Sequence, residues 1–149
     1  MKFKEKTKIT GRVRIENVTT GEIREVNNSL VNIGFDTLSA LTLSDVGGTA
    51  FDFLALGTGS STIIATNTLL DTETLRIAST GTQQTTNVAN DTARFIGSFT
   101  GDTTETINEI GIFNITTANT GSMLARAVFA DLNVITNDKI NVTYNIVFA

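Results

Sequence analysis

KINVTYNIVF, at residues 139–148, alternates apolar and polar side chains over its whole length. A period of two residues puts one set on each face of a strand, so the segment predicts a half-buried β-strand. Working back along the chain, MLARAVFADL (123–132) and INEIGIF (107–113) are two further apolar segments, separated from it and from each other by turn residues. The closing third of the sequence therefore predicts three successive strands of an antiparallel sheet.

The composition extends this prediction to the whole chain. The 149 residues are 40% hydrophobic and only 17% charged, and Thr and Asn together supply more than a quarter of them. Thr is β-branched and suits strands, whereas Asn suits turns. Because this length is typical of one domain, we expect residues 1–149 to form a single antiparallel β-sandwich of jelly-roll type with one short α-helix.

The first half of the chain contains a hairpin signal and the expected helix. Residues 10–26 alternate apolar and charged side chains around a Thr-Thr-Gly turn. Residues 33–43 then place Phe35, Leu38 and Leu41 at helical spacing, which predicts the helix.

The middle of the chain predicts further strands. Residues 51–58 are apolar enough for a buried central strand, and 66–73 resemble a short helical turn. Strands are expected at 75–82 and 92–100. The predicted core draws on the most apolar segments: Phe53, Leu54, Leu56, Ile112, Phe113, Val128, Tyr144 and Ile146.

The residue types needed for most catalysis are missing. The sequence has no His, Cys or Trp, so the commonest general bases, nucleophiles and transition-metal ligands are absent. The glycines and serines of residues 57–61 lack the following Lys of a phosphate-binding loop. Two carboxylate pairs, Asp71 with Glu73 and Asp102 with Glu105, could hold Ca²⁺, but solvation or helix capping is the favoured interpretation. We expect no enzyme activity, cofactor or metal.

Three charged residues interrupt apolar segments. Glu109 lies inside the segment 107–113, while Arg76 and Arg126 lie in apolar runs of their own. A buried or interfacial ion pair of Glu109 with either arginine is one interpretation, and exposure on the outer face of a sheet is the favoured alternative.

Charge is unevenly distributed along the chain. Residues 1–26 carry a net +3 and the remainder −7. The sequence predicts a basic N-terminal arm at residues 1–9 that either aids solubility or docks on the acidic body of a neighbouring subunit. The candidate subunit contacts are Lys2, Lys4, Lys6, Lys8, Arg12 and Arg14.

The most polar region lies between the strands expected at 75–82 and 92–100. Residues 83–90 are compatible with a long loop or with a projecting hairpin. An exposed tip of this kind could contact a receptor or a glycan, and its candidate residues are Gln83, Gln84, Asn87 and Asn90.

The order of these segments resembles small virion proteins of tailed bacteriophages and related archaeal viruses, of the tail, collar, fibre or head-decoration type. The matching parts span residues 10–149: the hairpin, Asn32 and Gly34 before the helix, LALGTGSS, ATNTLLDTETLR, INEIGIF, GSMLARAVF and KINVTYNIVFA. The resemblance implies a β-sandwich used as a building block of a virus particle.

Together these features predict a non-enzymatic structural virion protein that assembles into a symmetric ring or cluster on a capsid, collar or tail. Its expected partners are copies of itself and other virion proteins. The alternative is a receptor- or carbohydrate-binding module of a viral fibre. The acidic net charge of −4 argues against nucleic-acid binding, and no segment has the apolar length of a membrane span or a signal core. We therefore expect synthesis in the host cytoplasm and a final place in the virion.

Overall fold

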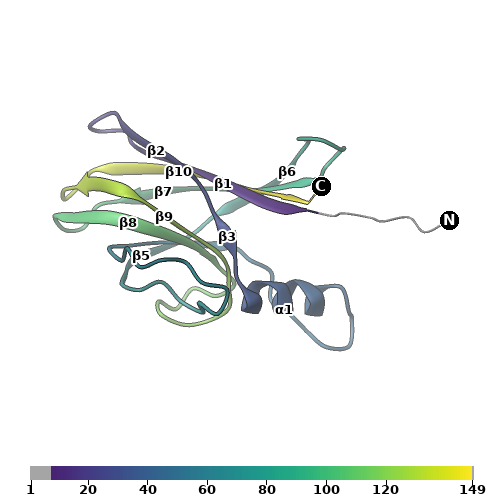
Figure 1. Ribbon diagram of the computed structural model, residues 1–149. Helices are drawn as coiled ribbons and strands as arrows, with labels where there is room; N and C mark the ends of the chain where they lie inside the picture. The colour runs from purple at the N-terminus through teal and green to yellow at the C-terminus, as the bar shows by residue number, and fades with distance from the viewer. Residues whose placement is uncertain (1–7, 149) are drawn as a thin grey trace.

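The chain folds into two antiparallel sheets of five strands, packed face to face (Figure 1). This computed structural model describes residues 8–148. Sheet A has the order β2 (Glu22–Asn27), β1 (Ile9–Asn17), β10 (Lys139–Phe148), β7 (Thr92–Thr100) and β6 (Thr80–Gln84). Sheet B has the order β3 (Ser29–Leu30), β9 (Met123–Val134), β8 (Glu105–Phe113), β4 (Phe53–Gly57) and β5 (Glu73–Ala78). The predicted all-β sandwich is confirmed.

Strands from the two ends of the chain pair with one another. β1 pairs with β10, β3 with β9, β4 with β8, and β6 with β7, so each pair encloses the next along the sequence. Nested pairing is also found in jelly rolls, where successive pairs alternate between the two sheets. Here β3, β9, β8 and β4 share sheet B, and β1, β10, β7 and β6 share sheet A.

The main core lies between the sheets. Along β10, Ile140, Val142, Tyr144 and Ile146 are all buried, as the alternation of that segment predicts. Of the eight core residues expected from the sequence, six are buried, while Phe53 and Val128 are half-buried. Burial also raises the pKa of the Tyr144 phenol.

A second, smaller core covers the outer face of sheet B. It joins Ala55, Phe113 and Met123 of the sheet to Leu70 of the loop 58–72 and Val31 before the helix. Sheet B is therefore covered on both faces, and the expected helical turn at 66–73 was wrong. Residues 66–72 are instead part of an irregular loop whose Leu70 packs onto the sheet, and β5 begins at Glu73.

The helix α1 (Asn32–Leu41) forms close to where the sequence places it, but with a different buried side. Gly34 and Thr37 are its buried residues, whereas Phe35 and Leu41 are exposed. The helix lies so close to β9 that a Cβ at Gly34 would come within 2.5 Å of the Leu124 carbonyl oxygen. Only a glycine permits this approach.

The strand expected at 75–82 is two strands in the structure. The chain leaves sheet B after β5 and enters sheet A at β6, with Ser79 between them. The polar region that follows is the connection of the β6–β7 hairpin, so the hairpin alternative holds for residues 83–90.

Candidate functional site

The most concentrated group of charged side chains lies on the outer face of sheet B. Glu109 of β8 and Arg126 of β9 are both fully buried there, with 2.8 Å between Glu109 Oε2 and Arg126 Nη2. The Arg126 Nε also donates to Oε2 at 3.0 Å. The favoured expectation that Glu109 is exposed was wrong, because the loop 58–72 folds over it.

Glu109 holds this loop through backbone hydrogen bonds. Its Oε1 accepts from the N–H groups of Gly59 at 3.0 Å and Thr72 at 2.9 Å, and its Oε2 accepts from Asp71 N–H at 3.0 Å. Both ends of the loop 58–72 are thereby fixed to the Glu109 carboxylate. A Cβ at Gly59 would lie 2.4 Å from Oε1, so the glycine is needed for the close approach.

Arg126 extends the network to the middle of the loop. Its Nη2 lies 2.8 Å from Asp71 Oδ2, and its Nη1 donates to Ser61 Oγ and Asn67 Oδ1 at 3.3 Å each. The Asp71 carboxylate also accepts from Ser61 N–H at 3.0 Å. Contacts with Ser61 and the Arg126 charge hold the pKa of Asp71 below its ordinary value, against an opposing effect of burial.

Arg76 belongs to a separate cluster and does not pair with Glu109. It forms two hydrogen bonds with Glu73, of 2.6 and 2.7 Å, and both side chains are buried. Its Nη1 donates to the carbonyls of Ile115 and Thr117 at 2.9 Å, and its guanidinium carbon lies 3.9 Å from the centre of the Phe113 ring. Arg76 therefore fixes the loop 114–122, as Arg126 fixes the loop 58–72.

These two clusters use their charges to hold loops. Asp71 and Glu73, expected to be solvated or to cap a helix, are instead the acceptors for Arg126 and Arg76. The sequence signal for this pairing is the three charges that interrupt apolar segments, Arg76, Glu109 and Arg126, with Glu73 three residues before Arg76. Buried charges need partners, so charges of opposite sign inside apolar segments indicate pairing.

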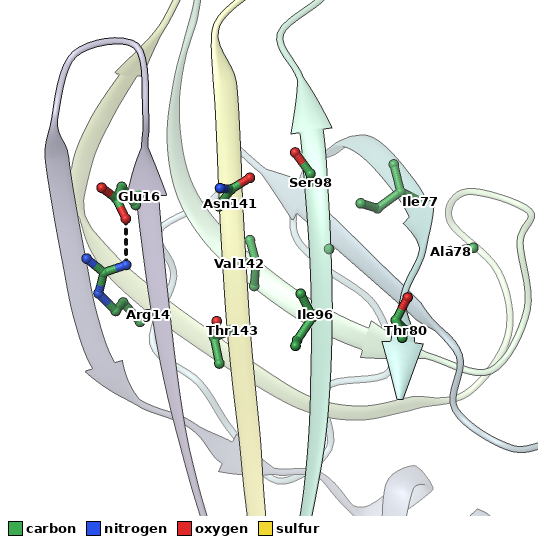
Figure 2. Close-up of a pocket in the computed structure, with 11 residues that line it drawn as sticks. Arg14, Glu16, Ile77, Ala78, Thr80, Ile96, Ser98, Asn141, Val142 and Thr143 are labelled. Carbon is green, nitrogen blue, oxygen red and sulfur yellow. Dashed lines mark hydrogen bonds and ion pairs between the residues drawn. The ribbon is translucent and has the colours of Figure 1, made fainter. Parts of the chain in front are cut away.

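A groove of about 550 Å³ crosses the outer face of sheet A (Figure 2). Asn141 and Thr143 of β10 and Ser98 of β7 line its floor, and Ile96 adds an exposed apolar side chain. At one side, Arg14 and Glu16 of β1 form an ion pair of 2.6 Å. The groove thus offers hydroxyl, amide and charged groups beside an apolar surface.

Only part of the predicted basic arm falls within the described residues. Lys2, Lys4 and Lys6 lie outside them, and Lys8 is exposed. Arg12 pairs with Glu25 of β2 at 2.6 Å, and Arg14 lies between Glu16 and Glu25. These two arginines therefore pair with Glu25 across the β1–β2 hairpin of their own chain. Their contact with a second subunit stays a prediction.

The predicted tip is arranged by Asp91. Gln83, Asn87 and Asn90 are exposed and Gln84 is half-buried. Asp91 accepts the N–H groups of Thr86, Asn87 and Val88 at 2.8 to 2.9 Å, which closes the loop after β6. These hydrogen bonds lower the pKa of Asp91, and the bond from Val88 N–H has the largest effect.

Within residues 8–148, no three Asp or Glu side chains are grouped as metal ligands, and no helix has the length and apolar character to cross a membrane. Comparisons with protein-family models, curated proteins and solved structures found no match to this chain. The resemblance to virion proteins stays a prediction from the sequence.

Proposed function

We propose that this chain is a non-enzymatic structural protein of a virus particle that assembles with copies of itself. The virion location rests on the order of segments along the sequence. Self-assembly is supported by one observation in particular, a group of exposed apolar side chains at the α1 end of the molecule.

This group, the α1 patch, comprises five large apolar side chains that are each 42% to 64% exposed: Phe35, Leu41, Leu43, Val46 and Ile64. They make up five of the eleven large hydrophobic residues that are exposed in the described part of the chain. The loop after α1 folds back along the helix, since Gly48 lies beside the Leu41 side chain. Ile64 lies near the start of α1, since the neighbouring Ala65 carbonyl accepts from Asn32 N–H at 2.8 Å.

An exposed apolar group of this kind favours association, because covering it removes apolar area from water. The rest of the fold suits a building block. The Arg76 and Arg126 clusters fix two loops to sheet B, so a docking surface that includes neighbouring loops keeps one shape from copy to copy.

The test is the mass of the protein in solution with the patch altered. We expect wild type to form a defined oligomer and the double variant Leu43→Asp with Val46→Asp to form smaller species, because each charge would be buried unpaired. Val18→Asp is the matched control. Val18 is 49% exposed, and the connection from β1 to β2 that contains it lies at the end of the sandwich away from α1 (Figure 1). An unchanged mass for the double variant, with the wild-type fold intact, would exclude the α1 patch as an interface.

A glycan-binding module is the second candidate, and the groove of Figure 2 is the observation that favours it. Sugar hydroxyls bind side-chain amides and hydroxyls, and Asn141, Ser98 and Thr143 supply these on one face. A glycan array with wild type and Asn141→Ala tests this role. Binding that the variant loses supports the module, whereas no binding by wild type removes it.

A further inference from the structure

The four outer edges of the two sheets differ in how they are protected against pairing with other strands. An edge strand exposes unpaired backbone N–H and C=O groups, and proteins usually block it with charges, with a bulge or by covering it. β2 carries Glu22, Arg24 and Glu25, and the Arg24 guanidinium crosses to the carbonyls of Ala130 and Asp131 beside it. β3 is only two residues long.

β5 is protected in another way. It carries Glu73 and Arg76, which bond to each other, and its pairing with β4 contains an irregularity at Leu56 and Gly57. Three of the four edge strands therefore carry charged residues or are only two residues long.

β6 has none of these protections among the described residues. It is the outermost strand of sheet A and pairs with β7 alone. Its sequence is TGTQQ, in which four residues are exposed and Gln84 is half-buried. No charged residue occurs between Ile77 and Asn90, and there is no Pro in the sequence. A Cβ at Gly81 would meet no atom within 4 Å, so no side chain covers the sheet face at this position.

We propose that β6 pairs antiparallel with β6 of a second copy of this chain, joining two A sheets into one continuous ten-stranded sheet. This inference rests on the proposed function and adds a second interface to the α1 patch. A second copy fits better than another partner because an uncharged strand meets its own copy without like-charge repulsion, whereas a charged edge such as β2 would not.

The geometry fixes the register of this pairing. A two-fold axis perpendicular to the sheet keeps each residue on its own face, and full overlap of residues 80–84 then centres the axis on Thr82. Thr82 lies opposite Thr82 of the second copy, Gly81 opposite Gln83, and Thr80 opposite Gln84. Thr and Gln side chains can hydrogen-bond across such a ladder. Five residues bury little area, so this contact acts together with others in an assembly.

Cysteine cross-linking tests the register directly, because the natural chain has no cysteine. Directly opposite residues have Cβ atoms about 4.5 to 5.5 Å apart, close to disulfide geometry, whereas two copies of residue 84 would be several residues apart. We expect Thr82→Cys to give a covalent dimer under mild oxidation. Gln84→Cys on the same strand and Thr103→Cys in the exposed loop after β7 are the matched controls, and both should stay largely uncross-linked.

Charge variants at the same position provide a second test. Thr82→Lys and Thr82→Glu each put like charges face to face and should reduce the mass of the assembly, whereas an equal mixture of the two should restore it. Thermal unfolding of each variant checks the fold, because Thr82 also lies opposite Arg94 of β7.

The outcomes separate the two proposals. If wild type is oligomeric but position 82 neither cross-links selectively nor changes the mass, the β6 contact is wrong and assembly through other surfaces stands. If the position 82 variants change the mass while the α1 patch variants do not, the β6 contact stands and the patch is excluded. A wild type that is monomeric at all concentrations contradicts both.

Discussion

At the scale of single residues, the buried pair of Glu109 and Arg126 shows how charge is used in this chain. Burying either ion alone is costly, and their attraction offsets that cost only when the remaining hydrogen-bonding groups are also satisfied. Glu109 meets this condition through three backbone N–H donors, and Arg126 through Asp71, Ser61 and Asn67. The pair therefore specifies where the loop 58–72 lies more than it adds stability.

Arg126→Met should leave Glu109 buried without its cation and lower the free energy of unfolding by about 3 to 5 kcal/mol. Arg12→Met is the control, because the Arg12 side chain is 65% exposed in its pair with Glu25 and should matter by less than about 1 kcal/mol. Chemical denaturation of the two variants measures the difference. Equal, small effects would show that the buried pair is dispensable.

The two aspartates with lowered pKa values make the fold sensitive to acid. An acid whose pKa is lower in the folded chain than in the unfolded chain adds stability above its unfolded pKa, and this contribution is lost as pH falls toward the folded value. For Asp71 and Asp91 the ordinary pKa is 3.8, so we expect stability to decrease below about pH 4. Asp91→Asn should lower stability at pH 7 and weaken its decrease in acid. Denaturation midpoints at pH 7 and pH 3 measure this, and parallel losses in both proteins would contradict it.

At the scale of elements, periodic segments were predictable and loop-covered surfaces were not. The predicted strand 139–148 has the same first and last residues as β10, because the alternation of apolar and polar residues marks one buried and one exposed face. The segment 66–73 was predicted to form a helical turn, with Asn67 or Thr68 as its cap and with Leu69 and Leu70 facing inward. Leu70 is buried because it packs on Phe113 and Met123 of sheet B, which are distant from it in the sequence. The division of 75–82 into β5 and β6 likewise depends on which sheet each half joins.

β10 is the element whose removal should matter most. It lies between β1 and β7 in the middle of sheet A and contributes four buried side chains to the core. Deleting residues 144–149 removes Tyr144 and Ile146 and takes the β10 partner from about half of β1 and of β7, so we expect no soluble, cooperatively folded protein. Circular dichroism and a thermal melt of the soluble fraction measure this. A cooperative transition like that of wild type would contradict the central place of β10.

At the scale of the whole molecule, the sequence predicts the sandwich but only part of the candidate site. Residues such as Glu109 and Arg126 could be recognised as unusual from their apolar neighbours, but the choice of exposure over pairing failed because the covering loop carries no periodic signal. The groove across sheet A and the open edge at β6 arise from strand order, which residues 107–148 alone do not determine.

The basic arm gives a prediction about assembly rather than folding. Replacing Lys2, Lys4, Lys6 and Lys8 by Gln should leave the fold unchanged but slow association or make it less complete at low salt. Exposed ion pairs contribute only about 0.2 to 1 kcal/mol each and are screened by salt, so the difference from wild type should shrink as salt rises. Light scattering during association follows both proteins. Identical curves at low salt would leave the arm as a solubilising segment.

The central claim is that this sandwich works as a self-assembling building block. Sedimentation velocity of the wild-type protein over a wide concentration range tests it most directly, because the method reports mass and homogeneity without altering any residue. We predict one defined oligomer whose population grows with concentration at the expense of the monomer. A single monomeric species up to the limit of solubility would contradict the account.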